Sequence, residues 1–244
     1  MRRQLASSIT LSRSALLFAG VLSLGIHACA ASPAPPAPAP GSTQPSVNTA
    51  EVVVAPDLVA DRLLLDVRRA NPRIDVELRY ATTDNFTGAV LPGYLANRAF
   101  LRREAALALG RVEERAEREG LRLRVYDAYR PARATAAMVA WTERAGRTDL
   151  LRDGYIASRS RHNLGLAVDL TLVDAARGTP LDMGTPFDTF SLAAHTANAS
   201  GQAHVDRMRL DRLMRAEGFT NYDQEWWHFT YSLPDPVRFD RVIE

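Results

Sequence analysis

The sequence predicts an α+β fold, a single domain with a mainly antiparallel central sheet flanked by helices. Segments that alternate apolar and polar residues, as half-buried strands do, are interspersed with segments whose apolar residues recur at helical spacing. The linking segments are irregular and lack the steady strand–helix–strand period of a doubly wound parallel sheet, so an antiparallel arrangement is favoured.

The first part of the domain is predicted to contain two strands and two helices. Gly120 ends the first helix, and Pro131 suits the first turn of the second, where its missing N–H is not needed. The expected elements are a strand over 74–80, a loop over 84–94, a helix over 97–119, a strand over 121–126 and a helix over 131–144.

The second part is predicted to alternate strands with a long irregular stretch and one helix. Gly218 ends this helix, as glycine commonly does. The expected elements are a strand over 164–173, a loop-rich stretch over 174–201, a helix over 204–217 and a strand over 226–231.

Residues 1–30 have the pattern of a secretory signal peptide. Arg2 and Arg3 form a charged start, an apolar stretch follows, and H-A-C-A-A supplies small residues for cleavage. The apolar stretch has about a dozen residues, whereas a membrane-spanning helix needs roughly 20, so a retained anchor is not favoured. Cys29 is the only cysteine. Two outcomes stay open for it: acylation, as in a bacterial lipoprotein, or plain cleavage after Ala30.

Residues 31–50 are predicted to be a linker rich in proline and alanine. Such a segment is extended and semi-rigid, and it would hold the domain formed by residues 51–244 away from a membrane or cell wall. We therefore expect an exported protein of the periplasm or cell envelope, attached to a membrane by a lipid if Cys29 is acylated. Nothing in the sequence indicates an oligomeric state.

The charge of the chain does not support a nucleic acid as partner. All 30 basic residues are arginine, but 28 acidic residues oppose them and the net charge is only +2. No long basic run occurs outside the predicted signal peptide, and a basic stripe is what nucleic-acid binding requires.

A metal site is the first candidate for chemistry. The stretch S-R-H-N-L-G-L-A-V-D-L-T-L-V (160–173) places Asp169 inside an apolar strand, where a carboxylate needs a partner. If the chain bends near Gly165, His162 and Asp169 approach one point on the sheet, and His228 would join them from a neighbouring strand. Two imidazoles and one carboxylate suit Zn²⁺ and leave a position for water. On spacing alone a second interpretation stays open, in which His162 lies in a loop and Asp169 pairs with an arginine.

Two charged residues are candidates for catalysis beside that metal. Glu225 precedes His228 by three residues in E-W-W-H, and a carboxylate near a metal-bound water can act as general base. Residues three apart in a regular strand point to opposite faces, so the chain must bulge around the two tryptophans, one of which is expected to wall the site. The alternative is an exposed glutamate at a strand edge. Arg130 could stabilise developing negative charge, with Asp127 orienting it, although one arginine among 30 carries little weight alone.

The combination of these segments resembles a known family. S-R-H-N-L-G-L-A-V-D matches S-x-H-x-x-G-x-A-x-D, and E-W-W-H matches the second signature, of zinc D-alanyl-D-alanine dipeptidases of the vancomycin-resistance type. Further segments in the expected order also look like this family: Y-A-T-T-D-N-F-T-G, Y-D-A-Y-R-P-A-R-A, D-L-T-L and M-G-T-P-F-D. The resemblance runs from about residue 75 to the C-terminal region.

The resemblance implies roles for eight residues. It implies one zinc ion on His162, Asp169 and His228, with Glu225 as acid and base and Arg130 stabilising the transition state. It also suggests that Tyr80, Ser160 and Asp188 hold a small D,D-dipeptide, with Asp188 on the ammonium group. From the residues alone, Asp188 is equally well a helix N-cap, Ser160 a turn residue and Tyr80 a strand aromatic. His195 and His204 fall outside both signatures and are expected at the surface or in loops.

Three functions follow from this sequence. The first is an exported zinc dipeptidase that hydrolyses D-Ala-D-Ala, and the export signal favours scavenging during wall turnover over the resistance role of the family's cytoplasmic enzymes. The second is a carboxypeptidase or endopeptidase acting on peptidoglycan stem peptides. The third is a zinc-stabilised module that binds wall peptides without cutting them, which would need neither Glu225 nor Arg130.

Overall fold

A five-stranded sheet is the centre of the fold in residues 54–244, the part of the chain that the computed structural model describes. The strand order is β3-β5-β6-β8-β7; β3 pairs with β5 in parallel, and every other pairing is antiparallel. The predicted α+β class with a mainly antiparallel sheet is therefore confirmed. The strands are β3 (Asp75–Val76), β5 (Leu121–Asp127), β6 (Ala167–Asp174), β7 (Phe219–Tyr222) and β8 (Glu225–Tyr231).

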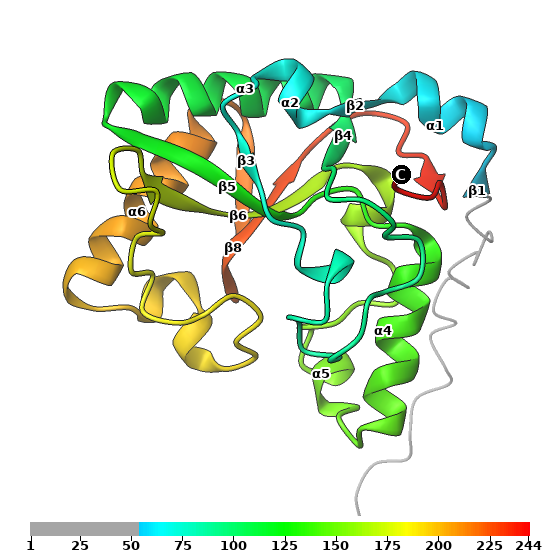
Figure 1. Ribbon diagram of the computed structural model, residues 1–244. Helices are drawn as coiled ribbons and strands as arrows, with labels where there is room; N and C mark the ends of the chain where they lie inside the picture. Colours follow the sequence, from blue (N-terminus) through cyan, green and yellow to red (C-terminus); the bar gives the residue numbers. More distant parts are fainter. Residues whose placement is uncertain (1–53) are drawn as a thin grey trace, which may run out of the picture. The chain divides into compact units, whose positions relative to one another are not determined.

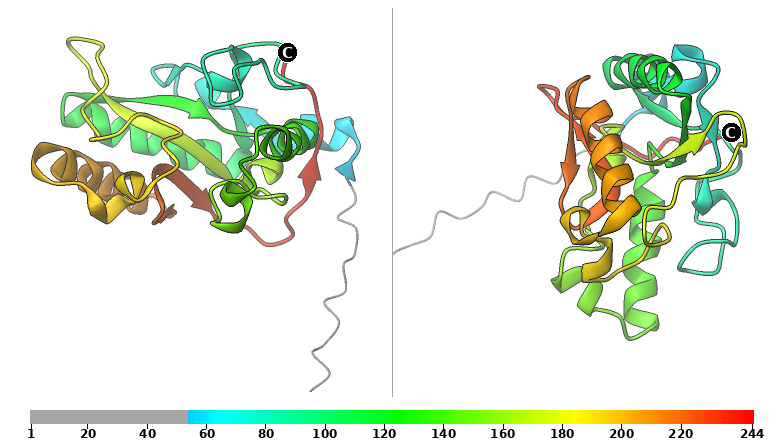
Figure 2. Two further views of the ribbon diagram at one scale, coloured as in Figure 1. Left: turned by 90° about the horizontal axis from the view of Figure 1, so that it is seen from below. Right: turned by 90° about the vertical axis from the view of Figure 1, so that its left-hand side faces the viewer.

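The two long helices α3 and α6 contact each other as well as the sheet (Figure 1). Helix α3 packs on β5 and α6 on β7, and Figure 2 shows the ribbon from two further sides. The helices are α1 (Asp57–Leu63), α2 (Val67–Ala70), α3 (Arg103–Arg118), α4 (Ala132–Arg144), α5 (Asp149–Arg152) and α6 (Gly201–Arg215). Four short 3₁₀ turns are η1 (Arg79–Ala81), η2 (Arg161–Leu164), η3 (Leu192–Ala194) and η4 (Thr196–Asn198).

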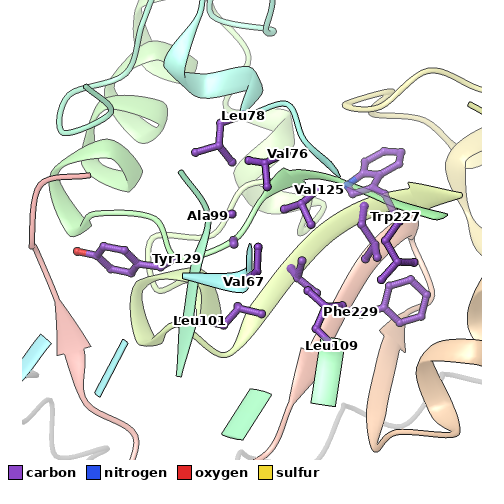
Figure 3. Packing of buried hydrophobic residues seen from close by; sticks show 14 of the residues in the cluster. Val67, Val76, Leu78, Ala99, Leu101, Leu109, Val125, Tyr129, Trp227 and Phe229 are labelled. Atoms are coloured by element: carbon purple, nitrogen blue, oxygen red, sulfur yellow. The ribbon is translucent and has the colours of Figure 1, made fainter. Parts of the chain in front are cut away.

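The core lies between the helices and the sheet. Leu109 of α3, Val125 of β5 and Phe229 of β8 are fully buried and gather in one cluster (Figure 3). Burying a side chain of this size stabilises a protein by about 1.5–3 kcal/mol. Helix α3 has an apolar face because its apolar residues recur at helical spacing. Strand β5 has one because its apolar and polar residues alternate, and the two apolar faces pack together.

The predicted helix over 97–119 begins later than expected, at Arg103. Residues Phe100–Arg102 form strand β4, which pairs antiparallel with β2 (Leu64–Asp66). Their apolar residues fit a helical spacing, but pairing with a segment far away in the sequence decides their conformation. A second small sheet pairs β1 (Val54–Ala55) in parallel with β9 (Arg238–Phe239).

The predicted strand over 74–80 is largely wrong, because only Asp75–Val76 belongs to the sheet. At the edge of β3 that faces away from β5, the Asn97 side chain forms the hydrogen bonds that a further strand would form. Its Nδ2 donates to the Val76 carbonyl at 2.8 Å, and its Oδ1 accepts from the Leu78 N–H at 2.8 Å. The chain then turns into η1, which carries Tyr80. An alternating pattern cannot reveal that a side chain replaces the next strand.

The remaining predicted elements are confirmed with small shifts at their ends. The strand predicted over 164–173 is β6, the helix predicted over 204–217 is α6, and the strand predicted over 226–231 is β8. The predicted signal peptide, the linker and Cys29 lie outside the described residues and stay predictions. Within 54–244, no helix is both long and apolar enough to cross a membrane.

Candidate active site

Two of the predicted metal ligands lie opposite each other on neighbouring strands. Asp169 of β6 is paired in register with His228 of β8. Residues directly opposite in an antiparallel pair project to the same face of the sheet, so the two side chains meet. The Nδ1 atom of His228 lies 2.9 Å from Oδ1 of Asp169.

The third predicted ligand, His162, lies in η2, which precedes β6. The chain turns back at Gly165, whose φ of +63° lies in the left-handed region that favours glycine. A Cβ atom there would lie 2.7 Å from a methyl group of Leu64, so the turn has no room for a side chain. The predicted bend is confirmed, and it puts Nε2 of His162 3.3 Å from Oδ2 of Asp169 and 3.2 Å from Nδ1 of His228.

The two histidine nitrogens, together with an oxygen of Asp169, are close enough to one another to hold a zinc ion. Ligands about 2.0–2.1 Å from one zinc ion at tetrahedral angles lie roughly 3.3–3.4 Å apart, close to the separations here. The tautomer of His162 also fits, since its Nδ1 lies 2.6 Å from the Ala128 carbonyl, which can only accept. Nδ1 therefore carries the proton, and Nε2 turns its lone pair toward the other two ligands.

Glu225 reaches the same point because β8 bulges, as its spacing from His228 predicted. Asn221 pairs with Phe229, but the next residue on β7, Tyr222, pairs with Glu225. Residues 226–228 of β8 therefore have no pairing partner on β7 and form the bulge. The Asn221 Nδ2 donates to the carbonyls of both Glu225 and His228, at 3.0 Å each. Oε2 of Glu225 then lies 3.7 Å from Nδ1 of His228. Sequence reasoning missed Asn221, whose only signal is its place in the turn-forming run N-Y-D-Q.

Arg130 lies beside the three ligands and is held by a buried carboxylate. Its Nε and Nη2 lie 2.9 and 2.8 Å from Oδ2 of Asp127, and its Nη2 lies 3.8 Å from Oδ2 of Asp169. The Tyr94 hydroxyl donates to the other oxygen of Asp127 at 2.6 Å. Asp127 orients Arg130 as expected from the sequence, whereas Tyr94 is a support that the sequence did not indicate.

The three residues expected to hold a substrate line the same cavity of about 430 Å³ as the ligands. The hydroxyl of Tyr80 donates to both oxygens of Asp188, at 3.1 and 3.2 Å, so the carboxylate lies at the wall that Tyr80 forms. The N-cap interpretation of Asp188 is wrong, since η3 begins only at Leu192. Ser160 is the N-cap of η2 and accepts from the His162 N–H at 3.2 Å, which agrees with a turn role and leaves its hydroxyl proton free to donate.

Burial controls the charges in this cavity. It raises the pKa of Glu225 well above its usual value, and the negative charges of Asp169 and Asp188 raise it further. Burial also raises the pKa of Asp188, with Asp169 adding to the effect. The pKa of Asp169 is instead held below its usual range, because His162 and His228 outweigh the effect of burial. Three carboxyl groups around one point therefore disfavour one another's charged forms, and a cation between them would relieve this repulsion.

The other aromatic and histidine residues take the places expected for them. Trp226 and Trp227 are both buried, and only Trp227 lines the cavity, which confirms a wall role for one of them. His204 is exposed on α6. His195 follows η3 in the irregular stretch, where its Nε2 lies 3.1 Å from the hydroxyl of Tyr155.

Comparison with known proteins identifies the family. A family model described as D-ala-D-ala dipeptidase matches residues 61–242, which is most of the chain and includes every candidate site residue. The chain belongs to the D-Ala-D-Ala dipeptidase family. The resemblance inferred from the two signatures is thereby confirmed.

Members of this family from several bacteria align with most of the domain. A D-alanyl-D-alanine dipeptidase of Streptomyces coelicolor is 38% identical over 169 residues, which are 63% of this chain and 84% of that protein. One from Escherichia coli is 36% identical over 183 residues, 74% of this chain and 90% of that protein. A solved vancomycin-resistance D,D-dipeptidase, VanXYg, aligns over 69% of this chain and 66% of its own with 18% identity and a TM-score of 0.35, too weak a likeness to support an argument.

Proposed function

We propose that this chain hydrolyses D-Ala-D-Ala to two D-alanines with one zinc ion held by His162, Asp169 and His228. One observation carries the proposal: the three donor atoms, Glu225 and Asp188 all face one cavity of about 430 Å³. Within residues 54–244 this is the one cluster of histidine, cysteine and acidic side chains close enough to hold a metal ion, which supports a stoichiometry of one.

Recognition of the dipeptide rests on Asp188 and Ser160. The ammonium group of a free dipeptide would lie against the Asp188 carboxylate, a strong acceptor that Tyr80 already holds from the other side. The Ser160 hydroxyl can donate to a substrate oxygen. The aromatic rings of Phe86 and Phe190 pack edge to face at 5.1 Å, and both line the cavity beside Asp188. This wall favours a substrate that ends at its ammonium group.

The catalytic roles follow from the positions of two charged side chains. When bound, a zinc ion supplies a Lewis acid that acidifies water and polarises a peptide carbonyl. Glu225 takes a proton from the attacking water and returns it to the leaving amine, a role that its position 3.7 Å from Nδ1 of His228 supports. Arg130, fixed by Asp127, stabilises the negative charge that develops on the carbonyl oxygen.

The experiment is a product assay on the full-length chain with D-Ala-D-Ala, with and without a chelator. Release of D-alanine should disappear with the chelator and return with Zn²⁺. Glu225→Gln should lower kcat by about 10²–10⁴ while zinc content is retained. Asp223→Asn, an exposed carboxylate two residues away, is the matched control and should keep full activity. Full activity of Glu225→Gln would show that another group is the base.

Comparison of substrates separates the three functions that the sequence left open. Free dipeptide should be cleaved much faster than a stem pentapeptide, because Asp188 would have no ammonium group to bind in the longer substrate. The reverse preference would indicate a carboxypeptidase. Zinc bound at one equivalent without turnover of any wall peptide would indicate a binding module.

We also propose that the enzyme is exported to the periplasm or cell envelope, where it degrades D-Ala-D-Ala released during wall turnover. The support is the pattern of residues 1–50, which lie outside the described part of the chain. Fractionation of cells that express the full chain tests this proposal, and Cys29→Ser separates lipid attachment from simple secretion.

A further inference from the structure

A buried arginine on α6 has only backbone carbonyls as hydrogen-bond partners. The side chain of Arg207 is 1% exposed. Its Nε donates to the Met183 carbonyl at 2.7 Å, its Nη1 to the His195 carbonyl at 2.7 Å and its Nη2 to the Ala193 carbonyl at 3.0 Å. Burial lowers the pKa of Arg207, and the Asp182 carboxylate opposes this effect without forming an ion pair with it among the described residues. Burying a charge without a direct ion pair is costly, so packing alone does not explain an arginine at this position.

The three carbonyls bracket Asp188 in the sequence. Met183 precedes Asp188 by five residues, and Ala193 and His195 follow it by five and seven. One planar guanidinium therefore joins both ends of the irregular stretch that carries the proposed ammonium-binding carboxylate. We call residues 183–195 the Asp188 loop. It lies within the stretch that connects β6 to α6, in yellow in Figure 1.

The Asp188 loop needs such a restraint. Asp188 has a φ of +59°, in the left-handed region that is unfavourable for a residue with a side chain. Such a conformation persists only where surrounding contacts impose it. The loop also approaches α6 closely: a Cβ on Gly184 would lie 3.1 Å from Cβ of Ala203 and 3.5 Å from Nη2 of Arg207. The loop also contacts β8, where the Nε1 of Trp226 donates to the Thr185 hydroxyl at 2.9 Å.

We propose that Arg207 is a positioning residue for substrate selection: it fixes both ends of the Asp188 loop and thereby places the carboxylate that selects a free ammonium group. This rests on the proposed function. Arg207 does not line the cavity, so it acts through the loop and not on the substrate. A misplacement of about 1 Å in a substrate-binding group can cost 10²-fold in rate, which sets the size of effect to expect.

The test compares two substrates in the full-length, zinc-loaded protein. D-Ala-D-Ala has the ammonium group, and N-acetyl-D-Ala-D-Ala lacks it. In Arg207→Met, which keeps an unbranched chain without donors, the ratio of kcat/KM for the first substrate over the second should fall at least tenfold. Most of the fall should come from a raised KM for the free dipeptide, with zinc content unchanged. Arg212→Met on the same helix, with a side chain 59% exposed, is the control and should keep the ratio.

A double-mutant cycle shows whether Arg207 acts through Asp188. Asp188→Asn should lower the same ratio. Adding Arg207→Met to Asp188→Asn should lower the ratio little further, because both substitutions remove the same function, the binding of the ammonium group by Asp188. Additive losses, or a folded Arg207→Met with an unchanged ratio, would overturn the proposal. If Arg207→Met does not fold, Arg207→Lys replaces it, since a single ammonium cannot hold three carbonyls in this geometry and should give the same fall.

Hydrogen exchange gives a readout that is independent of activity. In Arg207→Met or Arg207→Lys, amides of residues 183–195 should exchange faster, while those of β6 should not change. Unchanged exchange in the Asp188 loop would overturn the proposal. If the wild-type chain cleaves neither peptide, the proposed function fails, and hydrogen exchange alone then decides whether Arg207 fixes the loop.

Discussion

The stability of this protein is expected to depend on pH through one buried glutamate outside the active site. Glu113 of α3 is fully buried, and its Oε2 accepts from the Leu123 N–H at 2.7 Å, beyond the end of the two-residue strand β3. Burial raises the pKa of Glu113 from 4.5 to about 7, against the opposing effects of the Leu123 N–H and the Arg122 guanidinium. The folded state therefore holds this proton more tightly than the unfolded chain does.

The sign and size of the effect follow from linkage. Because the folded pKa is raised, the stabilisation is complete below about pH 4.5 and is lost as the pH rises through about 7. The two pKa values differ by about 2.5, and each unit is worth about 1.36 kcal/mol, so up to about 3 kcal/mol of stability is lost. Glu113→Gln keeps an acceptor for Leu123 and does not titrate. Relative to wild type, the variant should gain up to about 3 kcal/mol between pH 4.5 and pH 8.

Urea denaturation of both proteins at pH 4.5, 6 and 8, at one zinc concentration, measures this difference. Zinc binding is itself pH-dependent, but it affects both proteins alike and cancels from the difference. Glu114→Gln, the exposed neighbour on the same helix, is the control and should stay within about 0.5 kcal/mol of wild type at each pH. A stability difference between Glu113→Gln and wild type that is the same at all three pH values would refute the reasoning.

Three further predictions concern the active site. Arg130→Lys should lower kcat by about 10²–10³ at unchanged zinc content, while Arg133→Lys, an exposed neighbour, should not; equal steady-state rates for both variants would contradict the role of Arg130. Asn221→Leu should lower the free energy of unfolding by about 1–3 kcal/mol and reduce kcat, since two carbonyls of the bulge lose their donor. An unchanged denaturation curve would show that the bulge in β8 does not depend on Asn221. Zinc at 100 times its Kd should stabilise the chain by about 2.7 kcal/mol, and His162→Ala should abolish the thermal shift; a shift that survives in His162→Ala would place the metal elsewhere.

The clustering of His162, Asp169 and His228 could be predicted from the sequence because its signals are local. A carboxylate inside an apolar strand demands a partner, and a histidine seven residues earlier can supply one if a glycine allows the turn. Gly165, with its left-handed backbone and no space for a Cβ, meets that condition. The bulge in β8 was predictable for the same reason, since Glu225 and His228 could not otherwise share a face. Each inference needs only the geometry of a short segment and the chemistry of its side chains.

The supporting contacts could not be predicted, because one partner in each is a backbone carbonyl or a distant segment. Asn97 bonds to the backbone of residues 76 and 78 at the free edge of β3, and Asn221 holds the bulge through two carbonyls. Every residue has a carbonyl, so the sequence contains no sign of which one an asparagine or arginine will reach. Such contacts become visible only when the fold has brought the two segments together.

Arginine shows this difference most clearly. All 30 basic residues of the chain are arginine, and in the sequence nothing but a family signature distinguishes one from another. Burial distinguishes three of them: Arg102, Arg130 and Arg207 are at most 9% exposed, and of these only Arg130 forms an ion pair with a carboxylate among the described residues. A charge that is buried with its counter-ion can be retained for orientation beside a reacting group. A charge that is buried against carbonyls alone must be retained for the backbone it holds, and in this chain that backbone carries Asp188.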